Sequence, residues 1–306
     1  MQSLRSIFFY HFLKRQLAKS RNLKLTIEAI RADRERASDK LGKLPKNLES
    51  SKVTIEGLQA EWLIPNNCQK SAILLYLHGG AYVTGSILTH RRLAAHLAVA
   101  ACASALIVNY RLAPEDPFPA ALDDAMKCYL ALRASHPEAK VAIAGDSAGG
   151  GLALALCLRL RDEGMQQPDA MALLSPWTDL TLSNETHKTL ARVDPFFPDQ
   201  SGLKGAAGLY AGSHDLKDPY ISPQFADLTG LPPTLIHVGS REALFDDSLK
   251  MAERMQACGT PVKIKTYKDM WHVWQAFVGL FPEAGQSVKE IGEFLGEQLA
   301  PAKELS

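Results

Sequence analysis

Six short apolar runs alternate with helix-like stretches from residue 72 onward, and this alternation restricts the fold more than any other feature of the chain. Strands that are apolar throughout are buried on both faces, and parallel strands are joined by helices. The sequence therefore predicts an α/β fold with a mostly parallel central sheet flanked by helices. The runs cover residues 72–77, 105–108, 141–144, 171–174, 234–238 and 262–267, and the helical stretches cover 91–101, 120–133, 148–161 and 244–258.

Three segments lie outside this alternation. Apolar residues recur at helical spacing among many charges between residues 4 and 37, which indicates two amphipathic helices. Residues 52–64 alternate around Gly57 like two strands joined by a turn. The connection from residue 180 to 233 is rich in proline and glycine and too long for an ordinary crossover, so we interpret it as an inserted lid. We expect N-terminal cap helices in 1–48, one core in 49–180 and 216–306, and an inserted cap segment in 181–215.

The composition is that of an ordinary globular protein. A net charge of +1 creates no field that would attract nucleic acid or an acidic surface, so we expect a small-molecule partner, no nucleic acid and no stable membrane association. The five cysteines are an odd number without C-x-x-C pairs or metal-ligand spacing, which favours a reduced, cytoplasmic location and predicts no metal site. The basic, aromatic N-terminal stretch indicates an interfacial helix or, as we prefer, a lid helix, and not a secretory signal.

The pentapeptide GDSAG at 145–149 follows one predicted strand and opens a predicted helix of small residues. It matches G-x-S-x-G, in which a sharp strand-to-helix turn exposes the serine hydroxyl and the glycines let the neighbouring backbone pass closely. The start of the helix directs positive partial charge at the same place. The alternative is a Gly-Ser turn in a loop, which the flanking strand and helix disfavour. Ser147 is therefore the predicted nucleophile.

The tetrapeptide HGGA at 78–81 follows the first core strand. A loop in this position can donate backbone N–H groups to an oxyanion, and such a donor contributes about 3 kcal/mol to the transition state. We expect these donors among Gly79, Gly80 and Ala81, together with Ala148 at the start of the helix. His78 precedes the glycines, so we interpret it as a structural residue that holds the loop.

These motifs resemble those of the hormone-sensitive-lipase-like, or bacterial family IV, esterases of the α/β-hydrolase superfamily. The resemblance rests on HGGA with Tyr82, NYRLAPE at 109–115 followed by FPA at 118–120, the serine motif extended to Gly150, and DP at 218–219 with SP at 222–223. It implies an α/β-hydrolase fold whose N-terminal helices and insertion form a helical cap over the acyl pocket. The family's loop usually ends in a third glycine. Here Ala81 keeps the N–H, but its Cβ would be strained at positive φ and would narrow the pocket.

The general base is expected after a late strand, because the chain order in this fold is nucleophile, acid, histidine. His272 follows the strand at 262–267 and precedes a helix-like stretch at 273–279, whereas His237 lies within a strand and is predicted to be a buried core residue. The acid is one of Glu242, Asp246 and Asp247, which all follow the strand at 234–238. Each of the three can also be a helix N-terminal charge.

The resemblance selects Glu242, which falls on the family's usual aspartate when the strand and Leu244 are aligned. It also implies a serine carboxylic-ester hydrolase, a carboxylesterase that acts on short to medium acyl esters through an acyl-enzyme, with lactones and aryl esters within the same chemistry. Such a reaction needs no cofactor or metal. The alternatives are an amide or carbamate hydrolase with the same triad and a non-catalytic small-molecule receptor. Homodimers are common among the enzymes that the chain resembles.

Aromatic residues lie in both predicted cap segments. Phe196 and Phe197 in the insertion, and Phe8, Phe9 and Tyr10 near the N-terminus, either line an apolar substrate pocket or simply pack as amphipathic helices do, and we prefer packing.

Overall fold

The computed structural model describes residues 2–21, 26–66 and 68–301, which form one eight-stranded sheet with helices on both faces. The spatial order of the strands is β1-β2-β4-β3-β5-β6-β7-β8. The β1–β2 and β2–β4 pairs are antiparallel and every other pair is parallel. The strands are β1 Leu48–Ile55, β2 Leu58–Pro65, β3 Gln69–Leu77, β4 Ala103–Val108, β5 Lys140–Asp146, β6 Ala170–Leu174, β7 Thr234–Gly239 and β8 Val262–Tyr267. Each predicted apolar run lies in a strand, which confirms the mostly parallel sheet.

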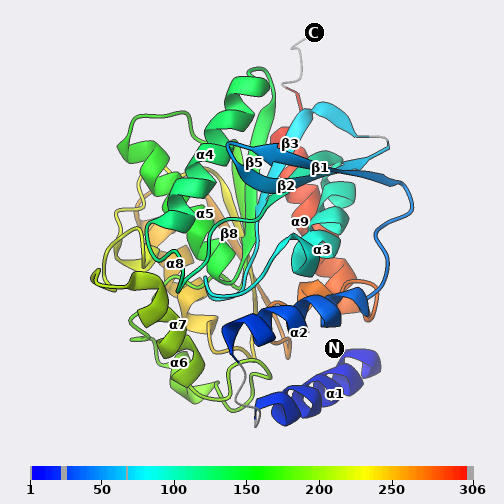
Figure 1. Ribbon diagram of the computed structural model, residues 1–306, viewed down its shortest axis with the longest axis vertical. Helices are drawn as coiled ribbons and strands as arrows, with labels where there is room; N and C mark the ends of the chain where they lie inside the picture. Colours follow the sequence, from blue (N-terminus) through cyan, green and yellow to red (C-terminus); the bar gives the residue numbers. More distant parts are fainter. Residues whose placement is uncertain (1, 22–25, 67, 302–306) are drawn as a thin grey trace.

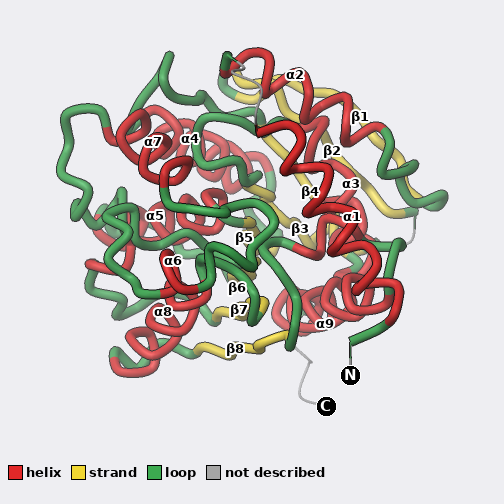
Figure 2. The backbone as a smooth tube through the Cα atoms, turned by 90° about the horizontal axis from the view of Figure 1, so that it is seen from below, coloured by secondary structure: helices red, strands yellow, loops and turns green. Residues whose placement is uncertain are grey.

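Helices cover both faces of the sheet (Figures 1 and 2). Figure 2 shows α4, α5 and α8 on one side of the strands and α3 and α9 on the other. The α-helices are α1 Leu4–Arg21, α2 Ile27–Asp39, α3 Ile87–Ala101, α4 Ala120–Ser135, α5 Ala148–Asp162, α6 Thr186–Thr189, α7 Ser201–Ala211, α8 Phe245–Ala257 and α9 Pro282–Leu299, and the 3-10 helices are η1 Pro223–Phe225 and η2 Trp274–Phe277.

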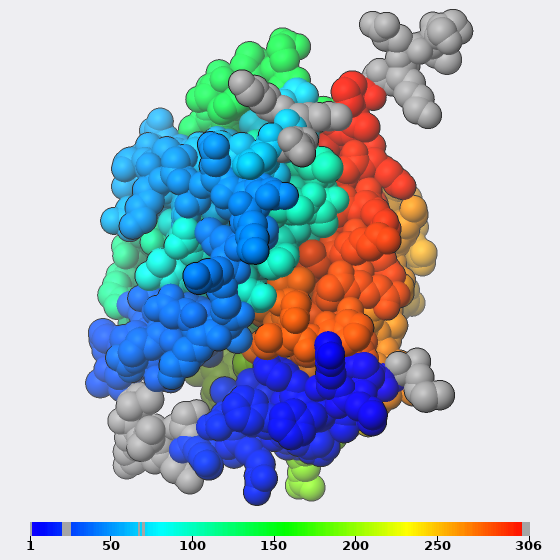
Figure 3. Space-filling model, turned by 90° about the vertical axis from the view of Figure 1, so that its right-hand side faces the viewer, coloured from blue at the N-terminus to red at the C-terminus, as the bar shows by residue number. Residues whose placement is uncertain are grey.

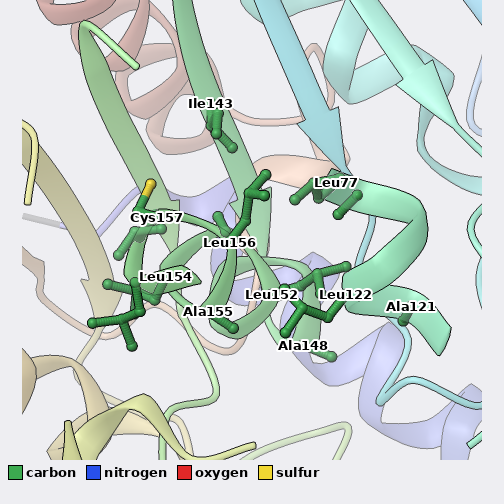
Figure 4. Packing of buried hydrophobic residues seen from close by; sticks show 14 of the residues in the cluster. Leu77, Ala121, Leu122, Ile143, Ala148, Leu152, Leu154, Ala155, Leu156 and Cys157 are labelled. Atoms are coloured by element: carbon green, nitrogen blue, oxygen red, sulfur yellow. The ribbon is translucent and has the colours of Figure 1, made fainter. Parts of the chain in front are cut away.

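The core is divided into two layers by the sheet, because successive side chains of a strand point to opposite faces. In β3, Leu75 and Leu77 pack in the cluster that contains α4 and α5, whereas Leu74 and Tyr76 pack in the cluster that contains α3 and α9. Figure 4 shows part of the first layer, where Leu152 and Leu156 of α5 and Leu122 of α4 lie around one side of Leu77. A strand of this kind is buried on both sides, and its sequence is apolar without alternation.

The N-terminal helices and the inserted segment lie at the same end of the molecule (Figure 1). Phe9 of α1 packs 4.8 Å from Phe277 and 5.6 Å from Phe281, measured between ring centroids. Figure 3 shows this contact as the blue surface of the N-terminal helices against the orange C-terminal region. The hydroxyl of Tyr10 donates to the carbonyl of Val193 at 2.7 Å, so α1 also holds the inserted segment.

Two elements differ from the sequence patterns. The stretch at 273–279, predicted to be helical, forms only the short η2, and α9 is not among the predicted helices. Leu25, which belongs to the predicted N-terminal helices, lies outside the described residues.

Candidate active site

Ser147 lies between the end of β5 and the start of α5, with φ 52° and ψ −123°. This conformation is sparsely populated for residues with a Cβ, and the surrounding backbone enforces it. A Cβ on Gly145 would lie 2.3 Å from the carbonyl oxygen of Gly149, and a Cβ on Gly149 would lie 2.1 Å from the carbonyl oxygen of Leu77. The two glycines of the motif are therefore required by close backbone contacts.

His272 contacts Ser147 directly. Its Nε2 lies 2.9 Å from Ser147 Oγ, a hydrogen-bond distance, although the two residues are 125 positions apart. Both are buried, with 5% of each exposed. Burial lowers the pKa of His272 to about 3, so the imidazole is neutral near pH 7 and able to accept a proton.

Glu242 is fully buried behind His272. Its Oε2 lies 3.9 Å from His272 Nδ1 and accepts a hydrogen bond from Ser175 Oγ at 2.8 Å. Neither Glu242 Oε1 nor His272 Nδ1 has a hydrogen-bond partner among the described residues. Burial, and then the charge of Asp194, raise the pKa of Glu242 well above its usual value.

The other two acids lie away from His272. The carboxylate of Asp246 accepts from the amide of Thr186 at 3.2 Å, and the carboxylate of Asp247 accepts from the amide of Thr178 at 2.9 Å. Both aspartates are in the first turn of α8 and connect it to neighbouring loops. Of the three candidate acids, the structure brings Glu242 to the histidine.

Four residues of the sequence were candidates for oxyanion donors, and Gly79 differs from the others. Its N–H already donates to Asp146 Oδ1 at 3.0 Å. Neither Gly79 nor Ala148 is among the residues that line the cavity at Ser147. Ala148 is fully buried as the first residue of α5. Its amide lies in the first turn of this helix, where N–H groups have no partner within the helix.

Gly80 and Ala81 both line the cavity beside Ser147. Gly80 has φ +127°, and a Cβ there would lie 2.1 Å from the carbonyl oxygen of Thr84, so only glycine fits. Ala81 adopts φ 57°, the positive φ at which its Cβ is strained. The loop thus holds its amides in a backbone conformation that costs free energy to maintain.

A cavity of about 160 Å³ opens at the serine. It combines an apolar wall with a small number of polar groups, as small-molecule sites do. The residues that line it are Arg34, Gly80, Ala81, His90, Asp146, Ser147, Phe196, Phe197, His272, Val273 and Ala276.

The aromatic residues of the two cap segments have different positions. Phe196 and Phe197 line the cavity, and the Phe197 ring lies 4.9 Å from the His272 ring. Phe9 and Tyr10 pack against Trp271 instead. Phe9 and Tyr10 are therefore packing residues, as preferred from the sequence, whereas Phe8 is exposed. For Phe196 and Phe197 the preference for packing was wrong, because both line the cavity.

Sequence reasoning missed Asp146 and His90. Asp146 Oδ1 accepts from the Tyr76 hydroxyl at 2.6 Å and from Gly79 N, and its Oδ2 lies 3.4 Å from His90 Nε2. The carboxylate thereby ties the serine motif to the HGGA loop and to α3. The position of Asp146 directly before the nucleophile was the available signal, whereas nothing in the sequence distinguishes His90 from other helical histidines.

Ser175 and Arg34 were also missed. Ser175 follows the carboxyl end of β6, at the edge of the sheet where the serine motif lies, so its place in the topology was a usable signal. Arg34 lies among other charged residues of α2, and its position in the cavity depends on how the cap packs.

Two further histidines are structural, as expected. His78 is buried, and its ring stacks on Tyr110 with centroids 4.2 Å apart. His237 is buried in β7, where its Nδ1 lies 2.8 Å from Ser287 Oγ. Burial lowers the pKa of His78 to about 3 and that of His237 to about 4, so neither carries a charge near pH 7.

Residues 2–21, 26–66 and 68–301 contain no group of three or more His, Cys, Asp or Glu side chains arranged to hold a metal ion. In the same part of the chain, the helices are too short or too polar to cross a membrane.

Known proteins resemble this chain in sequence and in structure. A family model described as alpha/beta hydrolase fold matches residues 74–276. An "Acetyl-hydrolase" of Streptomyces hygroscopicus is 41% identical over 244 residues, which cover 79% of this chain and 81% of that protein. An "Esterase" of Acinetobacter venetianus is 35% identical over 94% of this chain and 96% of that protein. The crystal structure of "an esterase from the bacterial hormone-sensitive lipase (HSL) family" superposes with a TM-score of 0.93 at 36% identity, covering 98% of this chain and all of that chain.

Proposed function

Because the chain belongs to the bacterial hormone-sensitive lipase family of α/β-hydrolase esterases, we propose that it hydrolyses esters of short to medium acyl chains through an acyl-enzyme formed on Ser147. The observation that carries this proposal is the distance of 2.9 Å between His272 Nε2 and Ser147 Oγ in a cavity at the end of β5. A serine hydroxyl is a weak nucleophile until a neighbouring base takes its proton, and His272 is in the position to do so.

In the acylation step, Ser147 Oγ bonds to the ester carbonyl carbon while its proton moves to His272 Nε2. The carbonyl electron pair moves onto oxygen, and the amides of Gly80, Ala81 and Ala148 are the proposed donors to this oxyanion. When the tetrahedral intermediate collapses, the bond to the leaving alcohol breaks and His272 returns its proton to that alcohol. Water then attacks the acyl-enzyme by the same route and releases the acid.

Glu242 is the proposed acid of the triad. The imidazole becomes a cation during both steps, and a buried cation is costly unless an anion is close. Nδ1 of His272 and Oε1 of Glu242 lack other partners among the described residues, so each is available to the other. The other carboxylate oxygen, Glu242 Oε2, lies 3.9 Å from His272 Nδ1, which is longer than a hydrogen bond. Catalytic hydrogen bonds in unliganded enzymes are often long and shorten when substrate is bound.

The cavity supports small acyl groups. A volume of about 160 Å³ with Phe196 and Phe197 on its wall has room for a few carbon atoms beside the serine. Aryl esters and lactones present the same carbonyl and stay within this proposal. The division into cap and core, homodimer formation, cytoplasmic location and the lack of a nucleic-acid partner stay predictions from the sequence.

The experiment that tests the proposal compares the purified protein with Ser147→Ala on p-nitrophenyl acetate and butyrate. We expect hydrolysis by the parent protein and about a 10⁴-fold smaller kcat for the variant. A fluorophosphonate probe should label the parent protein on Ser147, which peptide mass spectrometry locates. Equal turnover by both proteins, or labelling at another residue, contradicts the proposal.

A further inference from the structure

Arg34 places a cationic side chain in the cavity that contains Ser147 and His272. It belongs to α2, a helix of the N-terminal segment, and it lines the cavity together with Phe196 and Phe197 of the inserted segment. Its Nη1 donates to Thr84 Oγ1 at 2.7 Å, which fixes one of the five N–H donors of the guanidinium. The residue as a whole is solvent-exposed, so a ligand in the cavity can reach it.

The neighbouring arginines are paired with carboxylates, but Arg34 is not. Arg31, one helical turn earlier, forms an ion pair with Glu115 at 2.8 Å, and Arg91 of α3 forms one with Glu61. In the described residues 2–21, 26–66 and 68–301, no carboxylate lies within 4.0 Å of the Arg34 guanidinium. The surrounding protein atoms lower the pKa of Arg34, and no acidic neighbour opposes that shift. The guanidinium nevertheless stays protonated at neutral pH.

The acids nearest to Arg34 in the sequence and in the cavity do not neutralise it. Asp33 precedes Arg34 in α2 and lies 3.4 Å from Arg36 Nη2. Asp146 also lines the cavity, but its oxygens accept from Tyr76 and Gly79 and face His90. Glu35 follows Arg34 in α2, but its carboxylate accepts from Ser86 Oγ at 2.7 Å and lines a different cavity. The positive charge at the active site is therefore left for a group that the protein itself does not supply.

We propose that Arg34 binds a carboxylate carried by the substrate, so that the preferred substrates are esters with an anionic group near the scissile bond. This inference rests on the proposed ester hydrolysis and specifies its substrate class. The planar guanidinium forms two parallel hydrogen bonds with a carboxylate, and such charge-assisted pairs are stronger than neutral hydrogen bonds.

The test compares p-acetoxybenzoate with a neutral ester of the same shape, p-acetoxybenzamide. Arg34→Gln should lower kcat/KM for the anionic ester about tenfold, mainly through a higher KM, and change the neutral ester by less than about twofold. The different intrinsic reactivities of the two esters cancel when each variant is compared with the parent protein. Arg34→Lys should keep part of the preference because it keeps the charge. Arg36→Gln, on the exposed side of the same helix, is the matched control and should change neither ester.

A second measurement does not depend on turnover. In the Ser147→Ala background, the anionic product p-hydroxybenzoate should bind about tenfold more tightly than neutral p-hydroxybenzamide, and Arg34→Gln should remove that difference. Equal affinity for both compounds, or equal loss of both ester activities in Arg34→Gln, overturns the proposal. If the parent protein hydrolyses neither ester but retains the binding preference, the proposed hydrolysis fails while the role of Arg34 stands.

Discussion

Among the described residues, two histidine–carboxylate pairs have both side chains buried, and they differ in both geometry and pKa shift. His272 Nδ1 and Glu242 Oε2 are separated by 3.9 Å, and the imidazole contacts Ser147 beside a cavity that both His272 and Ser147 line. His187 Nε2 lies 2.6 Å from Asp247 Oδ2, and neither residue lines a cavity described above. The same two chemical groups therefore occur once beside a nucleophile and once without one.

The surroundings explain why the two imidazoles have opposite pKa shifts. Burial dominates at His272 and lowers its pKa. Burial also lowers the pKa of His187, but the adjacent carboxylate of Asp247 and the charge of Asp179 outweigh it, and the net pKa is raised. Thus His272 is neutral near pH 7 and can take a proton, whereas the carboxylate of Asp247 favours the protonated form of His187 in a pair that connects α6 to α8. The comparison shows that proximity of a histidine and an acid does not by itself indicate a base.

The largest expected effect is the difference in kcat between substitutions of the two histidines. His272→Gln should lower kcat for p-nitrophenyl acetate about 10⁴-fold, because the Ser147 hydroxyl loses its proton acceptor. His187→Gln should change kcat by less than about twofold, measured on folded protein. Comparable losses in the two variants would show that the 2.9 Å contact of His272 is not the catalytic one.

The next effect concerns two acids, Glu242 in the loop before α8 and Asp246 in the first turn of α8. Glu242→Gln should lower kcat about 10³-fold, because the imidazolium of the transition state loses its buried counter-charge. Asp246→Asn serves as the matched control, since its carboxylate caps α6 through Thr186, and we expect less than about a threefold change in kcat. A larger loss in Asp246→Asn than in Glu242→Gln would reverse the assignment. Steady-state kinetics of both variants decides between them.

The His187–Asp247 pair should affect the free energy of unfolding instead of the activity. Because the folded pKa of His187 is raised above 6.5, the pair stabilises the fold fully below that pH and loses its effect as the pH rises through the folded value. His187→Gln should lower the free energy of unfolding by about 3 kcal/mol near pH 6. The difference from the parent protein should shrink toward about pH 9. Urea unfolding of both proteins at the two pH values measures this difference in free energy of unfolding. A difference that grows with pH would contradict a stabilising charge on His187.

The smallest effect concerns Ser175, which donates a hydrogen bond to Glu242. Ser175 Oγ donates to Glu242 Oε2 at 2.8 Å and accepts from the amide of Val273 at 3.3 Å, so it connects the acid to the residue after His272. Ser175→Ala should lower kcat about tenfold, the value of roughly one lost hydrogen bond, with little change in KM. Ser175→Thr keeps the hydroxyl and should recover part of the activity. An unchanged kcat in Ser175→Ala would show that Glu242 is held by burial alone.

Local patterns were sufficient for much of the fold because they reflect short-range physics. The apolar runs predicted the strands, and the strand and helix around GDSAG predicted the position of Ser147 at a tight turn. The predicted helix at 273–279 was wrong because the chain there forms only a short 3-10 turn. Ser147 contacts His272, and Ser175 Oγ accepts from the amide of Val273, both from other elements. Tertiary contacts override helical propensity in such a segment.

The sequence by itself determined the order of the strands and of most core helices, and it predicted the serine and the histidine as the reacting pair, because periodicity and motif spacing act over a few residues of chain. Tertiary structure decided which of three acids lies behind His272, which loop amide is engaged by Asp146, and which arginine of α2 enters the cavity. These outcomes depend on distances between residues far apart in the chain. Such distances arise only when the sheet and the segments at its end have packed together, and no local pattern encodes them.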